Sequence, residues 1–188
     1  MNWRNTPRQW GLVAQGLHWL IALLVIGLAF VGLLMDELPN SPTKVQVYAL
    51  HKSFGITVLA LVILRLIWRL YDRRPELPAA MPRWQQRLAG LTHGLLYLLL
   101  FVMPISGWLY NSAANFPLRW FGLFTLPALS GPDSELKRLA HEVHEIGFYV
   151  LAALFALHAG AALWHHFVVR DRTLLQMLPG RAALETDR

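Results

Sequence analysis

The sequence contains no cysteine. A chain without cysteine forms no disulfide bond, holds no iron–sulfur cluster on thiolate ligands and attaches no c-type haem through a C-x-x-C-H motif. It is also poor in charge, because Asp, Glu, Lys and Arg make up only 15% of its 188 residues. Acidic residues are fewer than basic residues, with 11 Asp and Glu against 17 Lys and Arg. So low a charged fraction is unusual for a water-soluble domain.

Apolar residues make up 55% of the chain, and the mean hydropathy is +0.39. Four segments approach or exceed the length of about 20 apolar residues that spans a bilayer. They run from about residue 10 to 35, 45 to 68, 88 to 110 and 139 to 169. The first is too long for a signal peptide and lacks a cleavage site, so we expect it to be retained. The sequence therefore predicts an all-α fold, a four-helix transmembrane bundle, in a single domain over residues 1–188.

The basic residues are unevenly distributed over this topology. Twelve lie on the side of both termini and the second loop: Arg4, Arg8, Arg65, Arg69, Arg73, Arg74, Arg83, Arg87, Arg170, Arg172, Arg181 and Arg188. Four lie on the other side: Lys44, Arg119, Lys137 and Arg138. The positive-inside rule then places both termini and the second loop in the cytoplasm. Because the charges flank apolar runs and do not cluster with stacking aromatics, we expect the lipid bilayer, and no nucleic acid, as a partner.

Two of the histidines in the fourth apolar segment, His144 and His158, lie at the two ends of an apolar run. They are 14 residues apart, which is about 1400° at 100° per residue, or about 40° short of four turns. The side chains of His144 and His158 therefore leave the helix from nearly the same face, about 21 Å apart along its axis. Ionisable residues inside an apolar span are costly, which makes them candidates for a functional site.

Two further histidines match these in depth. His18 lies about 12 Å inside the cytoplasmic start of the first segment, and His158 about 16 Å inside the cytoplasmic end of the fourth. His51 and His144 each lie about 8 Å inside the external starts of the second and fourth segments. The sequence therefore predicts two pairs of imidazoles, His18 with His158 and His51 with His144, each drawn from two helices.

Paired imidazoles in a helix bundle point to metal chemistry. Neutral imidazole is a good ligand for iron, copper or zinc, and a flat porphyrin between two helices takes one axial ligand from each side. Zinc is disfavoured at His18 and His158, because no carboxylate or third histidine shares their depth. At the pair nearer the external side, His51 with His144 (the outer pair), zinc remains an alternative because His141, Glu142 and Glu145 are close. A histidine in a membrane helix can also serve only as a hydrogen-bonding group between helices.

Other polar residues near these pairs have more than one interpretation. His93 is expected to bond the helix end, a haem propionate or a quinone carbonyl. His165 and His166 are expected at the headgroup level. Lys52 and Arg65 either pair with haem propionates or extend to the membrane surface. A flat ring could approach the backbone at four nearby glycines: Gly16, Gly55, Gly147 and Gly160.

The longest connection runs from residue 111 to 138 and contains three prolines and several aromatic residues. A loop of this length is more often functional than not. We expect it to lie at the membrane interface, with residues 116–129 covering the outer pair. Residues 174–178, before Pro179, predict a short interfacial helix.

Several short motifs accompany these histidines. They are Gly16-Leu-His18-Trp19, Leu50-His51-Lys52, His93-x-x-Leu-Tyr97, Pro104-x-Ser-Gly-Trp108, His144-Glu145, Leu157-His-Ala-Gly-Ala-Ala-Leu-Trp-His-His166 and Asp171-x-Thr-Leu-Leu-x-Met-Leu-Pro179. Together they resemble the prokaryotic cytochrome b561 family over nearly the whole chain. The resemblance implies a four-helix inner-membrane protein with two haem b groups. One haem would be held by His18 and His158, and the other by His51 and His144.

One type of member in that family takes electrons from superoxide on the periplasmic side and reduces ubiquinone. The resemblance therefore implies an oxidoreductase that passes electrons from a periplasmic donor, with superoxide favoured, to ubiquinone. A first alternative is a cytochrome b subunit that passes electrons between a partner dehydrogenase and the quinone pool. A second is a non-haem membrane transporter or scaffold, which would be colourless.

Overall fold

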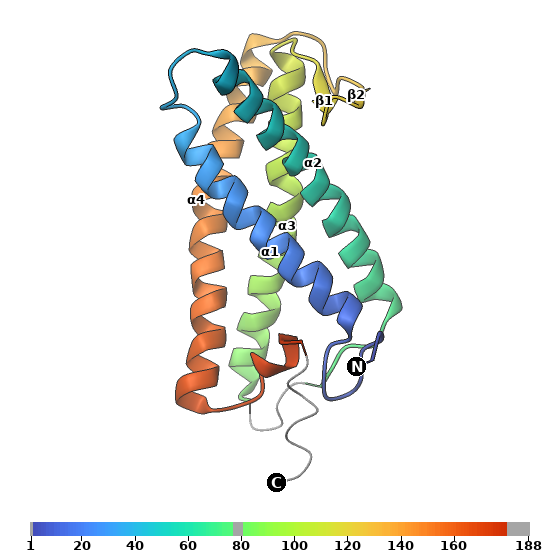
Figure 1. Cartoon of the computed structure of the whole chain (residues 1–188). Helices are drawn as coiled ribbons and strands as arrows, with labels where there is room; N and C mark the ends of the chain where they lie inside the picture. Colours follow the sequence, from blue (N-terminus) through green and yellow to red (C-terminus); the bar gives the residue numbers. More distant parts are fainter. Residues whose placement is uncertain (1, 77–80, 180–188) are drawn as a thin grey trace. The chain divides into compact units, whose positions relative to one another are not determined.

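The computed structural model describes residues 2–76 and 81–179. It contains four long helices, α1 (Leu12–Leu34), α2 (Pro42–Tyr71), α3 (Arg83–Ala113) and α4 (Ser134–Trp164) (Figure 1). Each is long and apolar enough to cross a membrane. The prediction of an all-α protein with four membrane-spanning helices is therefore confirmed. The cytoplasmic side of the termini stays a prediction, and Arg181 and Arg188, which were counted toward it, lie outside the described residues.

Three helices begin earlier than their apolar segments, and at α2 and α4 a polar residue caps the first turn. The side-chain oxygen of Ser41 accepts a hydrogen bond from the Lys44 backbone N–H (3.3 Å), and Pro42 takes the first helical position, where no donor is needed. The Asp133 carboxylate caps α4 in the same way, accepting from the Leu136 N–H at 2.9 Å. α3 starts at Arg83, before its apolar run. Hydropathy locates the apolar part of a helix, whereas the caps decide where it starts.

Large apolar side chains remain exposed along every helix. Leu23 on α1, Ile67 on α2, Leu98 on α3 and Ile146 on α4 are each more than half exposed. Apolar surface of this extent is unfavourable in water and is solvated by lipid tails in a bilayer. The chain is a multi-pass membrane protein.

The described chain divides into two compact units, and each of the four helices contributes to both. Unit 1 comprises Met1–Leu20, Ile63–Leu96 and Ala152–Arg188, and unit 2 comprises Ile21–Val62 and Tyr97–Leu151. The buried core of unit 2 is formed by Ile21, Val58 and Val62, with side chains of α1, α2 and α3 packed around it. The prediction of a single domain over residues 1–188 stays a prediction.

In unit 2, the connection from 111 to 138 contains a β-hairpin, which was not predicted from the sequence. Strands β1 (Leu118–Trp120) and β2 (Phe124–Leu126) pair antiparallel, and the turn between them has positive φ at Phe121 (47°) and Gly122 (75°). The Phe121 N–H donates to Ser53 Oγ (3.0 Å), and Trp120 Nε1 donates to Thr57 Oγ1 (3.1 Å). Three-residue strands are too short to show an alternating pattern, so these bonds to α2 decide the conformation.

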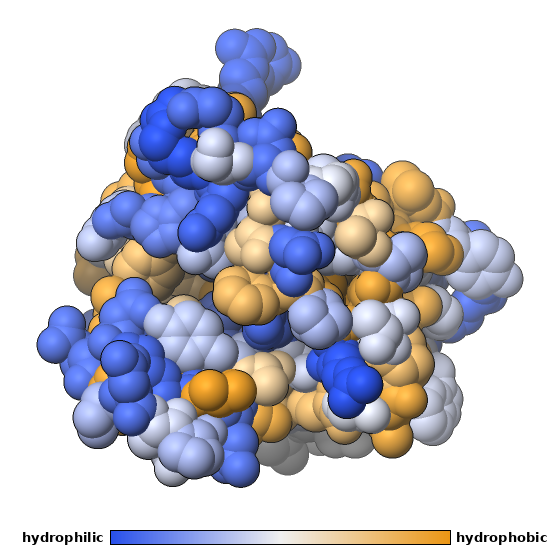
Figure 2. Space-filling view, turned by 90° about the horizontal axis from the view of Figure 1, so that it is seen from above, coloured by the Kyte–Doolittle hydropathy of each residue, from blue (hydrophilic) through white to orange (hydrophobic). Residues whose placement is uncertain are grey.

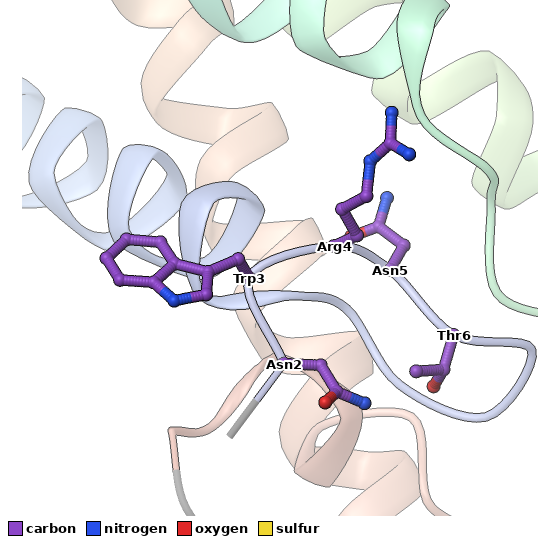
Figure 3. Close-up of a pocket in the computed structure, with 5 residues that line it drawn as sticks. All are labelled: Asn2, Trp3, Arg4, Asn5 and Thr6. Carbon is purple, nitrogen blue, oxygen red and sulfur yellow. The ribbon is translucent and has the colours of Figure 1, made fainter.

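In unit 1, the segment before α1 is attached to the end of α2. The Asn5 backbone N–H donates to Asp72 Oδ2 (2.8 Å), and Asn5 Nδ2 donates to the Arg73 carbonyl (2.6 Å). Asn5 Oδ1 accepts from the Gly11 N–H at 2.7 Å. Residues 2–6 line an open hollow on this segment (Figure 3). The described residues that line the hollow include no histidine and no acidic side chain.

The C-terminal segment of unit 1 is attached to α1 beside His18. After α4 the chain forms a π-helical turn at His165–Val169, then a 3₁₀ turn at Leu175–Met177 where a short helix was expected. Trp19 Nε1 donates to the Met177 carbonyl (2.8 Å), and Gln15 Nε2 donates to the Gln176 carbonyl (3.1 Å). Gln15 is 2% exposed, so this segment covers the first turns of α1.

Asp171 joins the two turns of this segment. Its carboxylate lies 2.5 Å from His165 Nδ1 and accepts from the Thr173 backbone N–H at 2.8 Å. Partial burial raises the pKa of the Asp171 carboxyl, but the hydrogen bonds from Thr173 and His165 outweigh burial, so its pKa is lowered below the ordinary value. The histidine expected at the headgroup level, His165, is thus an internal partner of this carboxylate.

We expect Asp171 to stabilise the fold at neutral pH and to lose this effect in acid. A carboxyl with a lowered folded-state pKa contributes stability above its unfolded pKa of about 3.9, and the contribution disappears as the pH falls through the folded-state value. Asp171→Asn should lower the Tm of the detergent-solubilised protein near pH 7, and the difference from wild type should shrink below about pH 4. A difference in Tm that stays constant from pH 7 to pH 3 would contradict this expectation.

Candidate functional site

Unit 1 brings together the predicted pair from α1 and α4. The ring centroids of His18 and His158 lie 6.2 Å apart, with their planes at 74°. A third imidazole, His93 on α3, lies with its centroid 5.1 Å from that of His158. The expectation that no third histidine shares this depth was therefore wrong. The depth of His93 was underestimated, because depth was counted from the start of the apolar segment. α3 begins five residues before that expected start at residue 88.

Unit 2 brings together the second predicted pair, from α2 and α4. The ring centroids of His51 and His144 lie 6.4 Å apart, with their planes at 71°. Each ring also packs against a glycine of another helix. A Cβ at Gly32 of α1 would lie 3.3 Å from His51 Cε1, and a Cβ at Gly107 of α3 would lie 3.2 Å from His144 Cε1. A residue larger than glycine at position 32 or 107 would therefore crowd the imidazole beside it.

The two separations fit a metal held between the rings. With metal–nitrogen bonds of about 2.0 Å and about 1.2 Å from each nitrogen to its ring centroid, two imidazoles on opposite sides of one metal have centroids about 6.4 Å apart. Edge-to-face ring contacts also span about 4.5–7 Å, so the distance by itself allows both arrangements. In unit 2, the ring nitrogens of His51 and His144 distinguish the two arrangements.

His144 has the hydrogen bonding of a metal ligand. Its Nδ1 lies 2.9 Å from the Met103 carbonyl oxygen, which can only accept, so Nδ1 carries the proton. The lone pair is then on Nε2, which is free to coordinate. Histidines that bind metals usually donate their other N–H to a backbone carbonyl or a carboxylate, because this orients the ring and raises its basicity.

His51 differs from His144 in its hydrogen bonding. Its Nδ1 is buried and has no hydrogen-bond partner among the described residues. A buried polar atom without a partner is unfavourable and calls for an explanation such as an ion or a functional role. Together with the position of His51 opposite His144, this is consistent with a ring placed for a cofactor and not for a contact between helices.

A zinc site at the outer pair receives no support. Across residues 2–76 and 81–179, no group of three or more His, Cys, Asp or Glu side chains is placed to hold a metal ion. His141, which kept zinc open, lies beside Tyr110, with ring centroids 5.5 Å apart, and 3.9 Å from the Glu145 carboxylate. A site of two imidazoles suits a planar cofactor that supplies its own equatorial ligands.

The family model for prokaryotic cytochrome b561 matches residues 9–180. The chain belongs to the prokaryotic cytochrome b561 family. It is 35% identical to cytochrome b561 homolog 2 of Escherichia coli (strain K12) over 181 residues, 95% of each chain. It is 30% identical to cytochrome b562 of Cereibacter sphaeroides, covering 88% of this chain and 92% of that one. It is 29% identical to the probable superoxide oxidase CybB of Yersinia pestis, covering 92% and 97%.

Membership of the cytochrome b561 family identifies a membrane electron-transfer protein and implies that it binds haem b. The alternative of a non-haem transporter or scaffold is therefore wrong. The two imidazole pairs fit this cofactor in number of ligands, in separation and, at His144, in the protonation of the ring.

The other polar residues near the cytochrome's histidines have protein partners. His93 Nδ1 donates to the Ala89 carbonyl of its own helix at 2.7 Å, which was one of the options for it. Lys52 Nζ donates to Asn111 Oδ1 at 3.0 Å, and Arg65 Nη1 donates to the Ala14 carbonyl at 3.3 Å. Contacts of His93, Lys52 and Arg65 with a propionate or a quinone stay predictions.

The glycines expected to face a flat ring divide into two kinds. A Cβ at Gly147 would lie 2.8 Å from the Met103 sulfur, so Gly147 makes room for a methionine and was wrongly assigned. A Cβ at Gly16, Gly55 or Gly160 would meet no described atom within 4 Å, and approach of a ring there stays a prediction.

Four residues that contact the paired histidines were not singled out from the sequence: Gly32, Met103, Ser106 and Gly107. Three of them lie in or directly before the motif Pro104-x-Ser-Gly-Trp108, which served only as part of the family resemblance. The motif signals these positions, but only the packing of α3 against α4 shows that His144 is what they contact.

Gly107→Ala should destabilise the cytochrome. The new Cβ would lie 3.2 Å from His144 Cε1 and 3.4 Å from its Nδ1, and the ring is held by its bond to Met103. Overpacking of this kind costs about 1–3 kcal/mol, which exceeds the gain of up to about 1 kcal/mol from alanine in a helix. The Tm of the purified protein measures the effect. Gly90→Ala, on the same helix with open space around the Cβ, is the control and should not lower the Tm.

Proposed function

We propose that this protein is a di-haem b cytochrome of the bacterial inner membrane that oxidises superoxide on the periplasmic side and reduces ubiquinone. The observation that carries the proposal is one imidazole pair in each unit, with centroids 6.2 and 6.4 Å apart. His18 and His158 would hold one haem b, and His51 and His144 the other. Haem b, when bound, supplies reversible one-electron oxidation and reduction at its iron.

The proposed reaction balances without a further reactant except protons. Two superoxide anions each lose one electron and become two molecules of dioxygen. One ubiquinone takes both electrons and two protons and becomes ubiquinol. The apolar surface of the four helices gives access to a lipid-soluble quinone, and the paired imidazoles are half-buried among these helices.

Support for superoxide comes from a relative and from local charge. The relative is the probable superoxide oxidase CybB, at 29% identity. We expect four cations of unit 2 to lie near the outer pair: Lys52, Arg119, Lys137 and Arg138. Arg138 is offset by Glu135 (3.0 Å) and Glu142 (2.7 Å). Because unit 2 holds five Lys and Arg against six Asp and Glu, attraction of an anion depends on the other three cations and not on net charge.

A second candidate is a cytochrome subunit that receives electrons from a partner dehydrogenase. It is favoured by apolar side chains in and beside the hairpin, since Leu123 is 74%, Phe116 63% and Phe124 56% exposed. Figure 2 shows hydrophobic residues exposed among hydrophilic ones on the face seen from above. Exposed aromatic patches with little net charge are typical of protein contacts. Copurification of a dehydrogenase, with no quinol formation by the isolated cytochrome, would favour this function.

Replacement of the paired histidines should remove the haems one at a time. His144→Ala or His158→Ala should each lower the haem b content from two per chain to one, because each leaves the other pair intact. His141→Ala, three residues from His144 and exposed, is the control and should keep both haems. The pyridine haemochrome assay on purified protein gives the stoichiometry. Two haems in both variants would refute the ligand assignment.

The donor is tested by mixing the purified protein with superoxide and ubiquinone in the presence of catalase. Ubiquinol formation, followed by absorbance, should exceed that of the haem-depleted protein several-fold, because superoxide alone must supply the electrons. Quinol formation at the level of the haem-depleted protein would exclude superoxide as the donor and leave the partner-dependent function.

A further inference from the structure

Ser106 is a buried serine on α3 whose hydroxyl lies within hydrogen-bond distance of both His144 and its carbonyl partner. Ser106 Oγ donates to the Met103 carbonyl oxygen at 2.9 Å and lies 3.1 Å from His144 Nδ1. His144 Nδ1 lies 2.9 Å from the same carbonyl oxygen. The three atoms thus form a triangle with sides of similar length, and Ser106 is only 5% exposed.

The protons in this triangle can be placed from the chemistry of its members. The Met103 carbonyl has only lone pairs, so it accepts from His144 Nδ1–H and from Ser106 Oγ–H at the same time. Two donors on one carbonyl oxygen share its negative charge, so each bond is weaker than it would be alone. Ser106 therefore weakens the hydrogen bond that His144 donates.

The other predicted ligand of unit 2 has no such arrangement. His51 Nδ1 is buried without a hydrogen-bond partner among the described residues. Control of ring basicity through a hydrogen bond at Nδ1 is therefore available at His144 and not at His51. A substitution at Ser106 that changes this bond acts on one ligand of one pair.

We propose that Ser106 is a positioning residue for His144 that holds the midpoint potential of the unit 2 haem at a more positive value. The proposal rests on the proposed ligation of that haem by His51 and His144. A strong hydrogen bond from Nδ1–H gives the imidazole more negative charge, and this stabilises the ferric over the ferrous state. By sharing the Met103 carbonyl, the Ser106 hydroxyl limits that charge and favours the ferrous state.

The test is a spectroelectrochemical titration of the purified holoprotein and its Ser106→Ala variant. Removal of the hydroxyl leaves the Met103 carbonyl to His144 alone, so the midpoint potential of the unit 2 haem should shift to a more negative value. The potential of the unit 1 haem should not change. The unit 2 component is identified as the one missing from His144→Ala.

Two further variants separate a hydroxyl effect from a packing effect. Ser106→Thr keeps the hydroxyl and should therefore keep the unit 2 haem at the wild-type midpoint potential. Ser112→Ala is the matched control, because Ser112 is equally buried on α3 but bonds to Trp108 and Leu129, and it should leave both potentials unchanged. If Ser106→Ala fails to retain haem, Ser106→Cys, a weaker donor of similar size, should give a smaller shift in the same direction.

An unchanged or more positive potential of the unit 2 component in Ser106→Ala, or in Ser106→Cys where the alanine variant loses haem, would overturn the role of Ser106. Retention of both components in His144→Ala would instead overturn the proposed ligation. The two failures are therefore distinguishable in the same titrations.

Discussion

An imidazole inside an apolar helix is costly when its ring nitrogens lack partners, and each unit of this protein brings two such imidazoles together. Lipid and aliphatic side chains offer neither hydrogen bonds nor coordination, so an isolated histidine at such a depth would destabilise its helix. In each unit, a second imidazole from another helix lies close by, with ring centroids about 6 Å apart. A metal between the rings, as in the proposed haem ligation, would satisfy two nitrogens at once.

The four helices contribute unequally to the two imidazole pairs. α4 supplies one ring to each unit, His158 in unit 1 and His144 in unit 2, while α1 and α2 each supply one partner. α3 supplies no member of a pair, yet it contacts the α4 ring in both units. It does so through His93 in unit 1 and through the segment 103–107 in unit 2. α3 thus lies against the paired imidazole of α4 in both units.

In each unit, a segment outside the long helices is attached beside a paired histidine. The hairpin of unit 2 bonds to Ser53 and Thr57, which follow His51 on α2. The C-terminal segment of unit 1 bonds to Trp19, which follows His18 on α1. Hydrogen bonds at these places fix the helix turns that carry the rings, so the extramembrane segments contribute to the geometry of the sites.

The sequence by itself determined the four apolar helices and the two pairs of histidines, because apolar run length and helical periodicity are local properties of the chain. Its short motifs indicated the family. Depth counted along each helix was enough to pair His18 with His158 and His51 with His144. The tertiary structure alone decided that His93 lies beside His158, that Met103 and Ser106 bond to His144, and that residues 118–126 form a hairpin. Periodicity gives the face and depth of a residue but not which helix lies opposite, and that choice depends on side-chain packing and hydrogen bonds between segments distant in the chain.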